Sequence, residues 1–153
     1  MLIRPFEKFD LSQINNIAQL LHPKWFDNNA IRNISIDSQI NNCFVAEQDN
    51  KIVGFITFSA QNGEAWINWL GVSINYHRQG IGGKLLSAMI DFIKKPGVKI
   101  VIVETVVEQN PLDGSYDKTL KFYYQQGFKI RKKYHQKRFN EFTYSKGLLE
   151  KAI

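Results

Sequence analysis

The chain contains one cysteine, few histidines and no long apolar run. Its only cysteine, Cys43, excludes an internal disulfide and a cysteine-rich metal site, and its apolar neighbours predict a buried core thiol. No apolar run approaches the roughly 18 residues of a membrane-spanning helix, and no signal pattern opens the sequence. We therefore expect neither a membrane span nor export, and a cytoplasmic protein. His22, His77 and His135 are too scattered for a metal-ligand pattern, so no metal is expected.

Two common nucleotide-binding loops are also absent from the glycine-rich run at residues 76–86. A Walker A loop needs a glycine at position 78 and Ser or Thr at position 85, where this chain has Arg78 and Leu85, and a dinucleotide fingerprint needs a glycine at position 85. Gly80, Gly82 and Gly83 nevertheless let a ligand approach the backbone closely. The amphipathic segment that follows would present unpaired N–H groups and a positive dipole end. We expect an anion site here, and a tight strand-to-helix turn without a ligand is the alternative.

Acidic residues are missing from residues 129–138, which hold much of the net charge of +6. The cations of this segment are Lys129, Arg131, Lys132, Lys133, Lys137 and Arg138. Such a patch attracts phosphate groups, whether of a cofactor or of RNA. The alternative is a solvated hairpin whose charges protect a strand edge. Aromatic residues are sparse in this segment, so nucleic acid is not an expected partner.

The spacing of apolar residues predicts alternating strands and helices. The expected strands are 2–4, 44–47, 52–59, 65–72 and 98–107, followed by a hairpin over 128–134 and 139–146. Turns at Asp49-Asn50 and Asn62-Gly63 should join antiparallel strands. The expected helices are Asp10 to Leu21, capped by Asp10 and ended by Pro23, then Asp27 to Ile40, Gly80 to Lys95, and Tyr116 to Gln126 after a Ser115 cap.

One helix joins strand 65–72 to strand 98–107, so these two strands should be parallel neighbours. That helix should bury an apolar stripe of Ile81, Leu85, Met89 and Phe92. At 153 residues, the chain is predicted to be one domain, 1–153, of the α/β class in the α+β sense. The sheet should be mixed and mostly antiparallel, with a central parallel βαβ pair and about four flanking helices.

The glycine run resembles the acyl-CoA pyrophosphate loop of the GNAT family of N-acetyltransferases, Arg/Gln-x-x-Gly-x-Gly/Ala. Gly80 and Gly82 match its glycines, and His77 stands where the family usually has Arg or Gln. The segment 122–128, Phe-Tyr-Tyr-Gln-Gln-Gly-Phe, resembles a second family signature, Phe-Tyr-x-x-x-Gly-Phe. The motifs stand in the family's order, and the resemblance covers about residues 44–144. It implies the acyl-CoA N-acyltransferase fold, with acetyl-CoA as co-substrate.

The resemblance also implies where acetyl-CoA binds. Its pyrophosphate would rest on the loop backbone, and its pantetheine arm would lie against strand 65–72, which would have to diverge from strand 98–107. If His77 contacts phosphate, its charge would make acetyl-CoA affinity pH-dependent. The cofactor-binding residues implied in this way are Leu70, Val72, His77, Arg78, Gln79, Gly80, Ile81, Gly82, Gly83 and Lys84.

The same resemblance implies that Tyr123 is the general acid that donates a proton to the departing sulfur. Members of the family take the general base from different strands or use ordered water, and Glu104 and Glu64 are the candidates here. We favour Glu104, because a carboxylate within an otherwise apolar strand needs a cleft or a cation partner. A structural salt bridge is the alternative for both. Trp25 and Phe26 are either core residues or the wall of an acceptor pocket.

The acceptor is left open by departures from the family pattern. Tyr116 and Thr119 stand where many members have Asn and Ala, and the connection 108–115 is longer than usual. The leading hypothesis is transfer of an acetyl group from acetyl-CoA to a primary amine of a small molecule or peptide. The alternatives are a non-catalytic acyl-CoA-sensing module and an RNA-directed protein, including an acetyltransferase whose basic hairpin recruits an RNA-associated acceptor. Homodimers are common in the family, so a homodimer is a further possibility.

Overall fold

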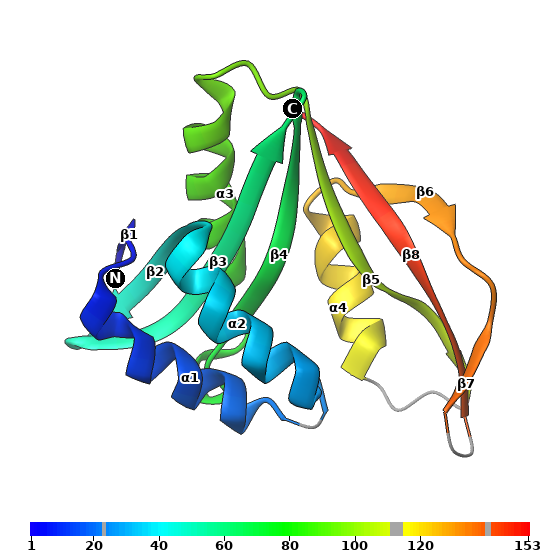
Figure 1. Cartoon of the computed structure of the whole chain (residues 1–153), viewed down its shortest axis with the longest axis horizontal. Helices are drawn as coiled ribbons and strands as arrows, with labels where there is room; N and C mark the ends of the chain where they lie inside the picture. Colours follow the sequence, from blue (N-terminus) through cyan, green and yellow to red (C-terminus); the bar gives the residue numbers. More distant parts are fainter. Residues whose placement is uncertain (23, 111–114, 140–141) are drawn as a thin grey trace.

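The computed structural model describes residues 1–22, 24–110, 115–139 and 142–153. Its eight strands form one sheet in the order β1-β2-β3-β4-β5-β8-β6, with β7 paired to β8 (Figure 1). The strands are β1 (Leu2–Pro5), β2 (Asn42–Gln48), β3 (Lys51–Gln61), β4 (Glu64–Val72), β5 (Ile100–Asn110), β6 (Lys129–Lys133), β7 (Lys137–Phe139) and β8 (Phe142–Ala152). The α-helices are α1 (Leu11–Leu20), α2 (Asn28–Ile40), α3 (Ile81–Lys94) and α4 (Ser115–Gln125).

The sheet is mixed and mostly antiparallel, as predicted. Among the described strands, β4 and β5 are the one parallel pair, and α3 connects them. Both predicted two-residue turns are present: Asp49 and Asn50 have φ of 54° and 62°, and Asn62 and Gly63 have φ of 55° and 79°. Two successive positive φ angles define the turn that suits the twist of a tight hairpin. The predicted fold class is confirmed.

The two faces of the sheet carry separate apolar clusters. One cluster packs α1 and α2 against β2 and β3, with Ile14, Ile34 and Phe55 fully buried. The other packs α3 and α4 against the opposite face and includes Leu85 and Met89. In Figure 1, α1 and α2 lie across the β2–β4 part of the sheet, and α4 overlaps β5, the strand against which it packs. None of the described helices is both long enough and apolar enough to span a membrane.

The predicted stripe on α3 is wrong at its last position. Phe92 is 46% exposed and Ile93 is buried, because steps of four residues from Ile81 reach position 93. Phe92 still packs the edge of its ring against Phe44 and Phe58, at centroid distances of 5.7 and 5.8 Å. The helix therefore keeps an aromatic contact outside its buried stripe.

Several predicted boundaries differ from the structure. The carboxylate of Asp10 does not cap α1: it accepts the Glu7 N–H and a bidentate pair of bonds from Arg4. Residues 108–110, predicted as a loop, belong to β5, and Ser115 is the first residue of α4 rather than its cap. Pro23 and residues 111–114 lie outside the described residues.

The final strand is longer than predicted and lies inside the sheet, where it pairs with β6 as the predicted hairpin requires. β8 continues to Ala152 instead of ending at position 146, and it lies between β5 and β6. Gly147 interrupts its apolar pattern for a steric reason, since a Cβ there would collide with the carbonyl oxygen of Lys132 on β6. The basic strand β6 is consequently the outer edge of the sheet.

Candidate functional site

The parallel strands β4 and β5 separate half-way along their length. Their pairing runs from Glu64 beside Ile100 to Ile67 beside Val103 and stops, although both strands continue. The register between β3 and β4 shifts at the same level, which leaves Asn68 as an extra residue on β4. Figure 1 shows the two strands diverging from this level. The divergence that acyl-CoA binding would require is therefore present.

The end of β4 offers backbone groups to the open side. The Ser73 N–H donates to the Val53 carbonyl oxygen at 2.8 Å, so the backbone of Ser73 is turned toward β3. Because successive residues of an antiparallel pair alternate in direction, the N–H and C=O groups of Leu70 and Val72 point away from β3. β5 has already separated there. Extended ligands with amide groups can pair with such a strand edge.

The connection from β4 to α3 forms a cradle of free N–H groups. Arg78 and Gly80 have φ of 63° and 77°, both in the left-handed region, and the first turn of α3 closes with the Lys84 N–H donating to the Gly80 carbonyl at 3.1 Å. Within the described part of the chain, no backbone N–H from Arg78 to Gly83 donates to a protein acceptor. Successive free amides at a helix N-terminus suit a phosphate group. The cradle therefore has the geometry of the predicted anion site.

Two glycines of the cradle serve different purposes. A Cβ at Gly80 would meet no atom within 4 Å, so glycine is favoured there by its positive φ alone. A Cβ at Gly82 would lie 3.2 Å from the ring of Phe122 on α4. Gly82 thus lets the start of α3 approach α4 closely, and the two predicted motifs meet at this contact.

The remaining loop residues predicted to bind the cofactor differ in how exposed their side chains are. Arg78, Gln79 and Lys84 are exposed beside the cradle, so the two cations are available to an anion. Ile81 is buried, and only its backbone faces the loop. His77 is engaged elsewhere: its Nε2 lies 2.7 Å from the Val72 carbonyl oxygen, to which it must donate. The His77 ring is thus turned back to the strand instead of into the cradle.

Tyr123 lies in the core, in the cluster that contains α3 and α4 residues. Its side chain is in the cluster that joins α3 and α4 to the sheet, is 5% exposed, and packs between the rings of Phe122 and Phe128 at 5.1 and 5.2 Å. Gly127, with φ of 92°, ends the helix and lets the Phe128 N–H donate to the Tyr123 carbonyl at 3.0 Å. Burial raises the pKa of the Tyr123 phenol well above its ordinary value, so the phenol carries a proton at neutral pH.

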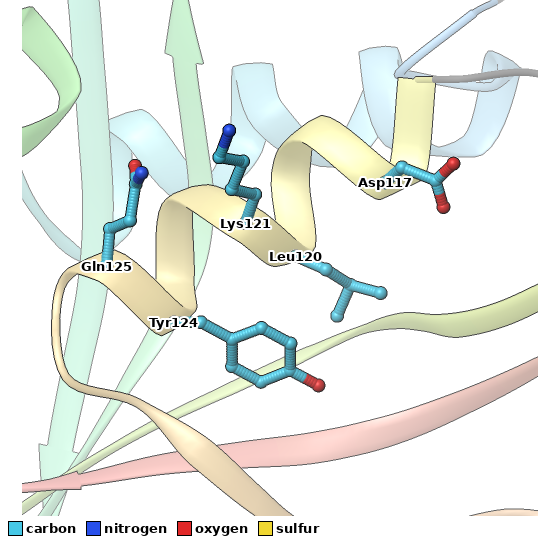
Figure 2. A pocket seen from close by; sticks show the side chains of 5 residues that line it. All are labelled: Asp117, Leu120, Lys121, Tyr124 and Gln125. Atoms are coloured by element: carbon cyan, nitrogen blue, oxygen red, sulfur yellow. The ribbon is translucent and has the colours of Figure 1, made fainter.

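Tyr124, the next residue, faces outward and is 45% exposed. Figure 2 shows Tyr124 and Leu120 extending to one side of α4 and Lys121 and Gln125 to the other, and these four residues line a hollow together with Asp117. The hollow measures about 470 Å³. Of the two neighbouring tyrosines, only Tyr123 points into the protein, as their separation of about 100° around the helix requires.

The two candidate glutamates lie at different places along the diverging strands. Glu104 is the first β5 residue after the last paired residue, Val103. Its carboxylate is 47% exposed and lies 4.0 Å from the Lys146 ammonium. Glu64 lies at the opposite end of β4 from Val72, about 26 Å away at 3.3 Å per residue, and pairs with Arg131 at 3.5 Å. The structure brings Glu104 to the divergence and leaves Glu64 away from it.

Sequence reasoning missed a polar group on the α2 side of β4. Asn68, the extra residue at the register shift, accepts a hydrogen bond from the Asn41 side chain at 3.2 Å. Trp69 donates its indole N–H to Asp37 on α2 at 2.7 Å. A polar Asn inside an apolar strand is the same signal that pointed to Glu104. Phe26 proves to be a core residue, packed edge-on to Trp69 at 6.0 Å.

The basic segment is partly neutralised by acids from other strands. Arg131 lies 3.5 Å from Glu64 and 3.9 Å from Glu150, and Lys133 pairs with Glu108. All five residues of β6 are exposed. These contacts favour a solvated, protected sheet edge. Within the described ranges, no group of three or more His, Cys, Asp or Glu side chains is placed to hold a metal ion.

Comparison with known proteins points to one family. The model of the acetyltransferase (GNAT) domain matches residues 39–130. A curated protein from Xenopus laevis, described as probable N-acetyltransferase camello, is 36% identical over 93 residues, or 58% of this chain. The matched segment is 39% of that relative's length, so the chain spans well under half of it.

Solved structures of the same fold superpose along nearly the whole chain. A GNAT-family protein from Desulfovibrio desulfuricans gives a TM-score of 0.84 at 15% identity, over 99% of this chain and 98% of that one. The ribosomal-protein-S18-alanine N-acetyltransferase from Escherichia coli gives 0.77 at 22%, over 99% and 93%. The PaiA N-acetyltransferase from Thermoplasma acidophilum, solved with coenzyme A, gives 0.74 at 20%, over 99% and 98%. At these identities the likeness shows the fold alone.

The match to the family model spans both the glycine cradle and the segment 122–128 of the signature helix, and these two motifs touch in the structure through Gly82 and Phe122. The chain belongs to the GNAT family of acetyltransferases.

Proposed function

We propose that this protein is an acetyl-CoA-dependent N-acetyltransferase that acts on a primary amine of a small molecule or peptide by direct attack on the thioester. One observation carries the proposal. The free N–H groups from Arg78 to Gly83, the outward-facing backbone groups of Leu70 and the outward Val72 N–H belong to one strand, loop and helix start. They match the pyrophosphate and the amide-bearing arm of coenzyme A in chemical type.

Acetyl-CoA supplies an acyl group already activated as a thioester. Attack by a neutral amine forms the N–C bond and breaks the C–S bond, and the thiolate that leaves needs a proton. Tyr123 is our candidate donor, because it lies on the signature helix α4 and a phenol is protonated at neutral pH. The outward Val72 N–H is our candidate donor to the thioester oxygen.

The amine must lose a proton during the transfer. Glu104 is our candidate acceptor of that proton, directly or through water, because its carboxylate is exposed where β4 and β5 separate. Nitrogen as the accepting atom agrees with the names of neighbouring structures, which include a ribosomal-protein-alanine N-acetyltransferase and an aminoglycoside 6'-N-acetyltransferase. The identity of the amine acceptor has to come from transfer assays with a set of amines.

Calorimetric titration with acetyl-CoA tests the donor half of the proposal. We expect saturable binding and a rise in Tm at saturating ligand. The chain offers a matched pair of variants, since Gly80 and Gly63 have φ of 77° and 79° and neither would bring a Cβ within 4 Å of another atom. Gly80→Ala and Gly63→Ala should cost similar stability, about 1 kcal/mol. Only Gly80→Ala should also weaken acetyl-CoA binding, by about tenfold or more, because the strain alters the cradle.

Release of free thiol in the presence of amines tests the acceptor half. The panel should contain a polyamine, an aminoglycoside, amino acids and peptides with a free N-terminus. Transfer to at least one of them is expected. Absence of acetyl-CoA binding would refute the proposal, and binding with no transfer to any amine would favour a non-catalytic acyl-CoA-sensing module.

A further inference from the structure

His77 contacts two parts of the molecule, the end of β4 and the connection from α1 to α2. Its Nε2 donates to the Val72 carbonyl at 2.7 Å, and the edge of its ring packs against Trp25 at a centroid distance of 5.6 Å, with an interplanar angle of 80°. Val72 ends the strand that borders the divergence, and Trp25 lies in the connection from α1 to α2. One side chain thus touches both the acetyl-CoA strand and a loop on the α1 and α2 side.

The hydrogen bond from His77 to Val72 lies where the cradle leaves β4. The Val72 carbonyl points to the open side of β4, where β5 no longer pairs with it. The bond from His77 closes a ring of chain over residues 72–77, immediately before the free N–H groups of the cradle. It therefore sets the angle at which the cradle leaves the strand, without presenting the His77 ring to the cradle itself.

The Trp25 end of the contact belongs to a loop that is itself well anchored. The N–H groups of Trp25 and Phe26 both donate to the Leu21 carbonyl, at 2.9 and 3.3 Å. The Lys24 ammonium lies 4.9 Å from the Trp25 ring centroid, and Phe26 packs against Trp69 of β4. A displacement of His77 would therefore act on this loop through the contact between the His77 and Trp25 rings.

We propose that His77 is a positioning residue that couples the acetyl-CoA cradle to the Trp25 loop, so that filling the cradle further restrains this loop on the α1 and α2 face of the sheet. The inference rests on the proposed function, since it takes acetyl-CoA as the ligand. It also explains why histidine can occupy this position: a glutamine could donate to the Val72 carbonyl, but only a ring also packs on Trp25.

Two substitutions separate the two contacts of His77. His77→Gln keeps a donor for the Val72 carbonyl and removes the ring from Trp25, whereas His77→Ala removes both. His135→Ala is the control, because His135 is an exposed histidine in the turn between β6 and β7. For each protein, calorimetry gives the acetyl-CoA affinity, and hydrogen exchange follows the Trp25 and Phe26 amides with and without acetyl-CoA.

The expected pattern differs between the two readouts. His77→Ala should weaken acetyl-CoA binding by about three- to tenfold, the size of one hydrogen bond, and His77→Gln should bind within about twofold of wild type. Acetyl-CoA should slow exchange of the Trp25 and Phe26 amides in wild type and in His135→Ala. Both His77 variants should lose this ligand-induced protection, since neither keeps the ring contact.

The inference is overturned if His77→Ala binds acetyl-CoA as wild type does, or if the ligand still protects the loop in that variant. A purely structural role would lower the Tm of both variants and leave the ligand-induced protection in place, which also contradicts the coupling. If wild type does not bind acetyl-CoA at all, the proposed function itself fails, and the two failures are thereby distinguished.

Discussion

The sheet has two halves that are covered in different ways. In the β1–β4 half, helices pack on both faces, and seven consecutive residues of β3, from Ile52 to Phe58, are buried. In the β5–β8–β6 half, α4 packs on one face, and every residue of the outer strand β6 is exposed. The two halves of the sheet pair with each other along β4 and β5 over four residue pairs, and these strands part after Ile67 and Val103.

This difference indicates a division of labour in the proposed reaction. The first half offers backbone groups to the donor, at Leu70, Val72 and the cradle, and a rigid, doubly covered strand holds them in place. The second half offers side chains, Glu104 and Tyr123, whose environments differ by burial. Changes in the first half should therefore alter stability and binding, and changes in the second half should alter turnover.

The largest expected effect is on Tyr123 in the second half. Tyr123→Phe keeps the ring packed between Phe122 and Phe128 and removes the proton donor, so turnover should fall by about 10²- to 10⁴-fold while acetyl-CoA affinity is retained. Initial rates with the best amine of the panel and calorimetry measure the two quantities. Tyr124→Phe is the matched control, since Tyr124 is the neighbouring tyrosine of α4 and is 45% exposed. Unchanged turnover in Tyr123→Phe would remove Tyr123 from the proposed role.

The donor side of the site could be predicted from the sequence because it depends on backbone conformation. Gly80 adopts a positive φ that few residues tolerate, and Gly82 permits a close approach of two helices, so glycine spacing alone marks both positions. The paired turns at Asn50 and Gly63 were readable for the same reason. The fold class followed from these turns and from the single helix between two apolar strands.

The acceptor side could not be predicted because it depends on pairing between distant segments. The extra residue Asn68 is defined only by the register of β3 against β4, and its contact with Asn41 joins residues 27 positions apart. The predicted strand 139–146 stopped before Gly147, although this glycine is needed inside β8 for the approach to β6. The sequence favoured Glu104 over Glu64, but the level at which β4 and β5 part, which places Glu104 directly after the last paired residue, is known only from the structure.

The next largest effect should fall on Asp10 in the first half, and on stability alone. Its buried carboxylate accepts two hydrogen bonds from Arg4, at 2.8 and 2.9 Å, and one from the Glu7 N–H at 2.8 Å. Burial opposes ionisation, but the bonds from Arg4 and Glu7 outweigh it and hold the pKa of Asp10 below its ordinary value of 3.8. Asp10→Asn should lower the free energy of unfolding by about 3 kcal/mol at neutral pH, with turnover per folded molecule unchanged.

The sign of the pH dependence follows from the lowered pKa. The stabilisation by the Asp10 carboxylate is present above pH 3.8 and is lost as the pH falls through the lower pKa of the folded protein. Urea unfolding of wild type and Asp10→Asn at several pH values should therefore show a difference that shrinks below about pH 4. A difference that stays constant into acid would mean that the carboxylate charge is not what stabilises the fold.

The smallest expected effect is a difference in turnover between two variants, each with one glutamate replaced, one glutamate from each half. Glu104→Gln should lower turnover by about 10²-fold, the lower end of the range for proton transfer, because water can still accept the proton of the amine. Glu64→Gln loses only a half-exposed pair with Arg131, worth about 1 kcal/mol at most, and should leave turnover within about twofold of wild type. Both variants change one carboxylate to an amide of the same shape, so position relative to the divergence is the remaining difference. Equal rates in the two variants would mean that the second half contributes no base, and that water alone takes the proton.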